Sequence, residues 1–169
     1  MFIIYKIKLF IFLWKRGLKS KYVHIGPRFD ISSSINFEGV TYIGPDAKIN
    51  GKGKVNFGDN TIVGPGLKIM TSVHNYETNL LPYDGKNDIS GDVQICENVW
   101  IGMDVIIMPN IKIGEGSIIG ARSFINKDVP AFSIMGGTPA KVLKYRDKAD
   151  YSTKVKEKRL YLHEKYGIK

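Results

Sequence analysis

Aliphatic or small side chains return at every sixth position along the middle of the chain. The members of this series are Ile89, Ile95, Ile101, Ile107, Ile113, Ile119, Ile125 and Ala131. Four places after each of the first seven stands a second short side chain: Val93, Val99, Val105, Ile111, Ser117, Ser123 and Val129. A period of six fits neither a helix, whose period is about 3.6, nor a lone strand, whose period is about 2. It is typical of a solenoid that turns a corner once per repeat. The pattern predicts an all-β solenoid, a parallel β-helix of hexapeptide repeats with these side chains pointing inward.

The same period is present upstream. Inward positions are expected at Ile25, Ile31, Phe37, Ile43, Ile49 and Val55, after which the register slips by two residues to Phe57, Val63 and Ile69. Glycine tolerates unusual backbone angles, so Gly51 and Gly53 would allow a loosened corner at the slip. With three faces to a coil, the inward positions predict between five and six coils.

Between Ile69 and Ile89 the step is twenty residues, which is not a multiple of six. The chain is therefore expected to leave the wall in an excursion loop over residues 70–88, and such insertions often carry function. His74 opens this loop and is a candidate general base, because imidazole exchanges protons near neutral pH. The alternative is an ordinary surface histidine. Glu77 either orients the imidazole or is only solvated.

These patterns divide the chain into three segments. Residues 23–136 form the β-helix, residues 1–22 an apolar and basic helical segment, and residues 137–169 a basic, mainly helical extension. The apolar run of residues 1–14 is too short to cross a bilayer, which needs about 20 residues. Two interpretations of residues 1–21 remain open. One is a helix that packs on the solenoid or on a neighbouring subunit. The other is an interfacial helix on a membrane, with six basic side chains over anionic headgroups: Lys6, Lys8, Lys15, Arg16, Lys19 and Lys21.

The formal net charge of +9 is concentrated at the two ends. Residues 1–28 hold seven Lys or Arg and no acid, residues 141–169 hold ten against four acids, and the body between them is acidic by four. This distribution favours an anionic ligand or an anionic surface at the ends. A nucleic acid is disfavoured as a partner, because no nucleic-acid-binding motif accompanies the charge.

Cysteine and histidine usage narrows the chemistry further. The single cysteine, Cys96, permits no intrachain disulfide, which suits a protein of the cytoplasm. Under the interfacial interpretation of residues 1–21, the protein would also contact the inner face of the cytoplasmic membrane. The three histidines, His24, His74 and His163, do not have the spacing of metal ligands, so no metal is expected.

Three motifs carry a resemblance to a known family: Asn98-Val99-Trp100-Ile101-Gly102, Lys127-Asp128-Val129-Pro130 and Gly137-Thr138-Pro139-Ala140-Lys141. Over about residues 43–146 the chain resembles the hexapeptide-repeat acetyltransferases of the maltose, galactoside and xenobiotic type. In layout it is similar to the O-acetyltransferases of capsule, O-antigen and exopolysaccharide assembly. The resemblance implies a left-handed parallel β-helix that assembles as a homotrimer, with acetyl-CoA bound between neighbouring subunits.

The resemblance also assigns roles to particular residues. His74 matches the catalytic histidine. Positions that match acetyl-CoA contacts are Trp100, Met103, Ala121, Asn126, Lys127, Lys141 and Lys144. The alternative for each is wall packing or a solvated charge. Two positions depart from the galactoside type, because Lys52 replaces a substrate-contacting acid and Gly44 an asparagine, and this disfavours a small free sugar as acceptor.

The expected function is acetyl transfer from acetyl-CoA to a hydroxyl of a sugar or glycan in surface polysaccharide assembly, with His74 as the general base. Two alternatives remain open. One is N-acetyl transfer to a nucleotide-linked amino sugar, which would use the same residues. The other is a non-catalytic β-helix that only scaffolds an assembly.

Overall fold

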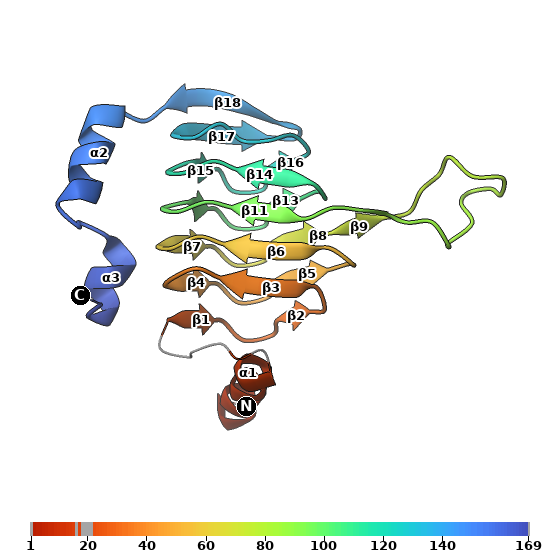
Figure 1. The fold of residues 1–169 in the computed structure, drawn as a ribbon, viewed down its shortest axis with the longest axis horizontal. Coiled ribbons are helices and arrows are strands. Elements are labelled where there is room, and N and C mark those ends of the chain that lie inside the picture. The colour runs from red at the N-terminus through yellow and green to blue at the C-terminus, as the bar shows by residue number, and fades with distance from the viewer. Residues whose placement is uncertain (1, 16, 18–21, 169) are drawn as a thin grey trace.

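The computed structural model describes residues 2–15, 17 and 22–168. Its body is a parallel β-helix whose three sheets form the faces of a prism, with β1 near the base and β17 and β18 at the top (Figure 1). We name the faces A, B and C in the order in which the chain visits them. Six strands of face A follow one another in parallel, which makes six coils and confirms the predicted all-β solenoid.

The strands are short and return to the same three faces. Face A contains β1 (Val23–Ile25), β4 (Thr41–Ile43), β7 (Thr61–Val63), β12 (Trp100–Ile101), β15 (Ile118–Ile119), β17 (Ser133–Gly137) and β18 (Ala140–Tyr145). Face B contains β2 (Asp30–Ile31), β5 (Lys48–Asn50), β8 (Lys68–Met70), β13 (Ile106–Ile107) and β16 (Phe124–Ile125). Face C contains β3 (Ser34–Phe37), β6 (Lys54–Phe57), β11 (Val93–Ile95) and β14 (Ile111–Ile113). Outside the faces lie α1 (Phe2–Lys15), β9 (Ser72–Val73), β10 (Ile89–Ser90), α2 (Lys148–Lys156) and α3 (Tyr161–Tyr166).

The core is a set of stacked columns of aliphatic side chains. On face A the column is formed by Ile25, Ile43, Val63, Ile101 and Ile119, each at most 2% exposed. A coil of three hexapeptides takes eighteen residues, as between Ile25 and Ile43 and between Ile101 and Ile119. The step from Ile43 to Val63 takes twenty. The two extra residues lie in the bend before β6, where Gly51 has a φ of 128°, so the predicted slip is confirmed.

Two predicted inward positions were wrong, Ile89 and Ala131. Ile89 is 50% exposed, because it lies in β10, which pairs antiparallel with β9 at the root of the excursion rather than with the wall. Ala131 is exposed because the last coil is two residues short. Ile113 bridges to Val129 and Ile119 pairs with Met135, each sixteen residues ahead. Val129 and Met135 therefore fill the interior in its place.

The bends between successive faces form the edges of the prism, which we name by the two faces they join. Asp, Asn and Gly occupy positions in these bends that other residues would fit poorly. Asp46 and Asp104 at the A–B edge, and Asn60 and Asn98 at the C–A edge, all have positive φ, which Asn and Asp adopt more readily than other residues with a side chain. Gly102 is required for a different reason, the closeness of the next coil. A Cβ at Gly102 would lie 2.6 Å from the backbone nitrogen of Ala121.

The three edges of the prism are used differently. Helices α2 and α3 run along the C–A edge, where Tyr151 bonds Asn98 and Glu115 and the backbone N–H of Leu162 donates to Asn60. The excursion leaves from the B–C edge, on the opposite side from the helices (Figure 1).

The remaining elements lie at the two ends of the stack. Strand β18 forms an antiparallel hairpin with β17, at the start of a segment that is predicted from the sequence to be mainly helical. Its side chains are almost all exposed, so no hydrophobic period marks it as a strand. Helix α1 packs across the base, while Arg16, Lys19 and Lys21 lie outside the described residues. Among the described helices, none combines the length and the apolar character needed to cross a bilayer.

Candidate active site

His74 lies at the B–C edge, directly after β9, where the chain leaves the wall. The antiparallel pair β9 and β10 closes the root of the excursion, with Val73 opposite Ile89. The imidazole stacks on Tyr83 of the same excursion, with ring centroids 4.0 Å apart and planes inclined by 7°. Its side chain remains 57% exposed, so the ring is oriented and still accessible.

Asp88, the residue directly before β10, orients the imidazole. Its Oδ1 lies 2.9 Å from Nδ1 of His74, and its Oδ2 accepts a hydrogen bond of 2.8 Å from Nζ of Lys52. The hydrogen bond from Lys52, with a second from His74, lowers the pKa of the Asp88 carboxyl. An ionised carboxylate only accepts hydrogen bonds, so Nδ1 carries the proton. In the neutral ring Nε2 then has a free lone pair, as a general base requires.

In the sequence Asp88 is one of several acids of the excursion, and Glu77 is the one that lies nearest His74 along the chain. In the structure the backbone N–H of Glu77 donates to the side chain of Asn75, whereas it is Asp88 that contacts the ring. The separation of fourteen residues between His74 and Asp88 hides the pair from sequence reasoning. The one feature of the sequence that could indicate this contact is that His74 and Asp88 lie near the two ends of the predicted excursion.

Met103 and Ala121 lie one above the other at the A–B edge. Each follows a strand of face A in successive coils, and the tight stacking of Gly102 against Ala121 brings the two corners together. Trp100, at the start of β12, is 55% exposed, and Met103 is 49% exposed. These side chains thus face solvent instead of packing into the wall.

The predicted basic positions occupy two places. Lys141 and Lys144 lie on β18, where Lys141 pairs with Gly136, a residue that approaches Gly120 beside Ala121. Asn126 and Lys127 follow β16 and so lie at the B–C edge, the edge that also carries His74. All four are exposed.

The predicted site residues therefore form two groups on two edges of one chain. The A–B edge carries the group of Met103, Ala121 and Lys141, and the B–C edge carries His74 with Asp88 and Lys52. Face B separates them.

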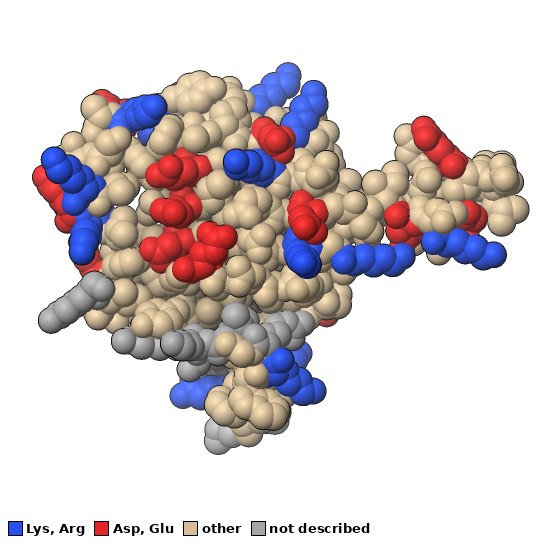
Figure 2. All heavy atoms as spheres, in the orientation of Figure 1, with Lys and Arg blue, Asp and Glu red and all other residues tan. Residues whose placement is uncertain are grey.

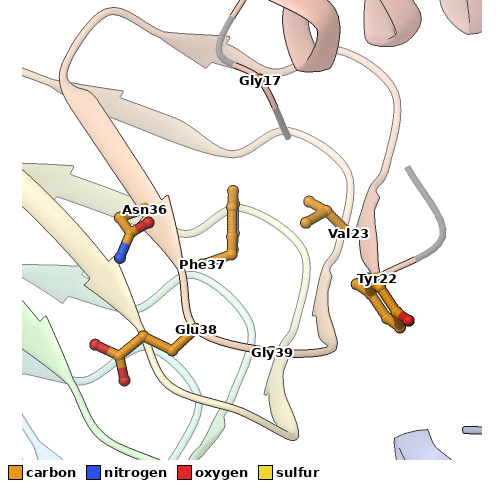
Figure 3. Close-up of a pocket in the computed structure, with 7 residues that line it drawn as sticks. All are labelled: Gly17, Tyr22, Val23, Asn36, Phe37, Glu38 and Gly39. Carbon is orange, nitrogen blue, oxygen red and sulfur yellow. The ribbon is translucent and has the colours of Figure 1, made fainter. Parts of the chain in front are cut away.

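Other features of the described residues do not contribute to this site. No group of three or more His, Cys, Asp or Glu side chains in that part of the chain is arranged to hold a metal ion. A pocket near the base is lined by residues from Gly17 to Gly39 and contains none of the predicted site residues (Figure 3).

Known proteins with similar sequences share the repeat. The family described as bacterial transferase hexapeptide (six repeats) matches residues 92–127. A putative acetyltransferase of Schizosaccharomyces pombe is 34% identical over 127 residues, which cover 72% of this chain and 52% of the yeast protein. The chain spans between 27% and 52% of the length of the curated relatives it matches first.

Two solved structures are similar over most of the chain. The maltose O-acetyltransferase from Clostridium difficile 630 is 31% identical with a TM-score of 0.66, over 75% of this chain and 66% of the other. A hexapeptide-repeat acetyltransferase from Vibrio cholerae O1 biovar eltor, complexed with acetyl-CoA, is 26% identical with a TM-score of 0.59, over 73% and 72% of the two chains.

Proposed function

Since the chain belongs to the hexapeptide-repeat acetyltransferases of the maltose O-acetyltransferase type, we propose that it transfers an acetyl group from acetyl-CoA to a hydroxyl of a sugar or glycan. The observation that carries this proposal is the arrangement of His74, oriented through Nδ1 by Asp88 and exposed at an edge of the wall. A β-helix that only scaffolds an assembly has no need for such a group.

The proposed reaction is direct acyl transfer. Nε2 of His74 takes the proton of the acceptor hydroxyl while its oxygen attacks the thioester carbonyl of acetyl-CoA. The tetrahedral intermediate then collapses, the C–S bond breaks, and the proton held by the imidazolium passes to the departing thiolate. Backbone N–H groups stabilise the oxyanion of the intermediate. Asp88 stabilises the imidazolium between the two proton transfers.

Acetyl-CoA binds, in this proposal, along the A–B edge of one subunit, against the B–C edge of the next. Trp100, Met103 and Ala121 contact the pantetheine arm and the acyl end. Lys141 and Lys144 on β18 contribute positive charge to the phosphates of the nucleotide. Asn126 and Lys127 of the adjacent subunit complete the cleft beside its His74.

A homotrimer with face B turned toward the three-fold axis is the assembly we propose, because both groups of site residues flank that face. Ile106 and Phe124 support it. They are in register on neighbouring strands of face B, and both are only partly buried in the single chain. Apolar side chains on an outer face are suited to a subunit interface.

The acceptor we propose is a glycan of surface polysaccharide assembly. Lys52 supports this choice, because it stands where the galactoside type has a substrate-contacting acid. Its ammonium group is paired with Asp88 and so does not replace that acid as a sugar ligand. The excursion beside His74 also presents exposed apolar side chains, with Tyr76 74% and Leu81 96% exposed, across which a chain of sugars can lie.

The test is an assay with acetyl-CoA and a panel of glycans, nucleotide sugars and free sugars, in which free thiol and product mass are measured. His74→Ala should lower turnover by about 10² to 10⁴, because a general base contributes that much. Glu77→Ala, in the same excursion, is the matched control and should keep wild-type turnover. Unchanged turnover in His74→Ala removes His74 from the mechanism. Absence of thiol release with every acceptor contradicts the proposed activity itself.

A further inference from the structure

Helix α1 is held to the base of the solenoid by one of its faces. Phe12 and Leu13 are 8% and 2% exposed, and Leu9 packs beside them against the core. Phe12 meets Phe29 of the first coil edge to face, with centroids 5.1 Å apart. Lys8 lies over the same ring and donates to the backbone oxygen of Phe29. The helix is therefore docked on the protein through residues at helical spacing.

The opposite face of α1 is apolar and uncovered. Ile7, Ile11 and Trp14 recur at i, i+4 and i+7, which places them on one stripe, and Phe10 borders it. Ile7 is 54%, Phe10 65%, Ile11 43% and Trp14 71% exposed. Helix α1 lies beyond the first coil, at the end of the stack (Figure 1). This stripe therefore points away from the protein.

Lysines border the stripe on both sides. At 3.6 residues per turn, Lys8 and Lys15 fall on one flank and Lys6 on the other. The helix contains no acidic residue. Basic side chains gather around α1, while acidic side chains cluster on the body above it (Figure 2). An apolar stripe with cationic borders is the pattern of a helix that lies in the interface of an anionic bilayer.

A second copy of the chain fits this surface less well. Two such helices packed stripe to stripe would bring their cationic borders together. A neighbour along the sides of the prism would not reach a stripe at its end. At fourteen residues, the helix is also too short to span a bilayer, which needs about 20.

We propose that α1 docks the solenoid end-on to an anionic lipid surface, with Ile7, Phe10, Ile11 and Trp14 inserted and Lys6 and Lys15 against the headgroups. In this arrangement the coils rise away from the membrane. The proposal does not depend on acetyl transfer, and its test measures binding alone.

The experiment is co-sedimentation of the full chain with phosphatidylcholine vesicles containing about a third phosphatidylserine, and with pure phosphatidylcholine. We expect binding to the anionic vesicles at low salt, weakened by added salt. The double variant Phe10→Ser/Trp14→Ser should bind at least about tenfold more weakly, since apolar insertion contributes to binding. Lys6→Gln/Lys15→Gln should lose most of the salt-sensitive part.

Tyr161→Ser is the matched control, because it removes an aromatic side chain that is 59% exposed on α3, away from the stripe. This variant should bind vesicles like the wild type. Equal binding by Phe10→Ser/Trp14→Ser and the wild type would assign the attraction to basic side chains elsewhere, such as those of residues 137–169, and overturn the proposal. An absence of binding to anionic vesicles at low salt would also overturn the proposal. If Phe10→Ser/Trp14→Ser then changes the oligomeric mass in sedimentation, the stripe is instead covered by a second copy of the chain.

Discussion

At the scale of single residues, the excursion brings His74, the proposed general base, next to the carboxylate that orients it. Asp88 reaches His74 only because β9 and β10 pair antiparallel and bring the two ends of the loop together. The hydrogen bond to Lys52 holds the second carboxylate oxygen. The imidazole is thus fixed from one side by Asp88 and on its plane by Tyr83.

Asp88→Asn tests this positioning role. An amide cannot stabilise the imidazolium as a carboxylate does, so kcat should fall by about 10²-fold. That loss is smaller than the roughly 10⁴-fold for the buried aspartate of a serine protease triad, because His74 is also held by stacking and is open to water. The KM for acetyl-CoA should stay unchanged, and Asp88→Glu should restore part of kcat. A rise in KM without a fall in kcat would make Asp88 a structural residue of the loop.

At the scale of elements, the C-terminal helices are fastened to the corners of the wall. The Tyr151 hydroxyl donates to Glu115 at 2.8 Å and accepts from Asn98 at 2.9 Å, and the ring lies beside Phe132 and under Arg146. Burial, together with the hydrogen bond to Glu115, raises the pKa of the Tyr151 phenol. Tyr151 thus stays neutral and keeps its donor at working pH.

Tyr151→Phe removes this hydroxyl and keeps the ring packing. Asn98 and Glu115 lose a partner, so the free energy of unfolding should fall by about 1–2 kcal/mol. For a chain of this length that corresponds to a drop of about 2–8 °C in Tm, measured by calorimetry. Tyr161→Phe provides the comparison, because Tyr161 is exposed and should leave Tm unchanged. Equal Tm values for both variants would show that the hydroxyl does not fasten α2.

At the scale of the whole molecule, one chain separates the two halves of the proposed site. Met103 and Ala121 lie on the A–B edge, and His74 lies on the B–C edge. In the proposed trimer, a site shared between two subunits would bring the two halves together. This arrangement can be tested by mixing two inactive proteins.

His74→Ala and Ala121→Trp should each leave at most about 1% of turnover when assembled alone, the second by filling the proposed acetyl-CoA cleft. In trimers co-assembled from equal amounts, one interface in about four joins an intact B–C edge to an intact A–B edge. Turnover should therefore recover to about a quarter of the wild-type value, measured after confirming the trimer by sedimentation. Mixed trimers without activity would place both groups within one chain, or remove Ala121 from the site.

The sequence by itself determined the repeat, the number of coils and the position of the excursion. The inward period is a local property of the chain, because each face of a coil places an inward side chain six residues after the preceding face. A break in the period is therefore visible without any structure. For the same reason the sequence indicates His74 as a candidate site residue, because it lies at the break in the period. Ile101 and Ile107 are predicted inward and are fully buried.

Only the tertiary structure decided what depends on pairing between distant strands. Ile89 and Ala131 keep the period but are exposed. The strand pairing changes at the root of the excursion, and the last coil is two residues short. The contact of Asp88 with His74 and Lys52 arises from closure of a loop, which no spacing reveals. Helix α1 shows the same dependence: the sequence left packing and membrane contact as alternatives, and the structure shows that Phe12 and Leu13 pack while Phe10 and Trp14 remain exposed. The physical reason is that burial depends on which surfaces the folded chain brings together, whereas the periodic pattern records only which side chains favour burial.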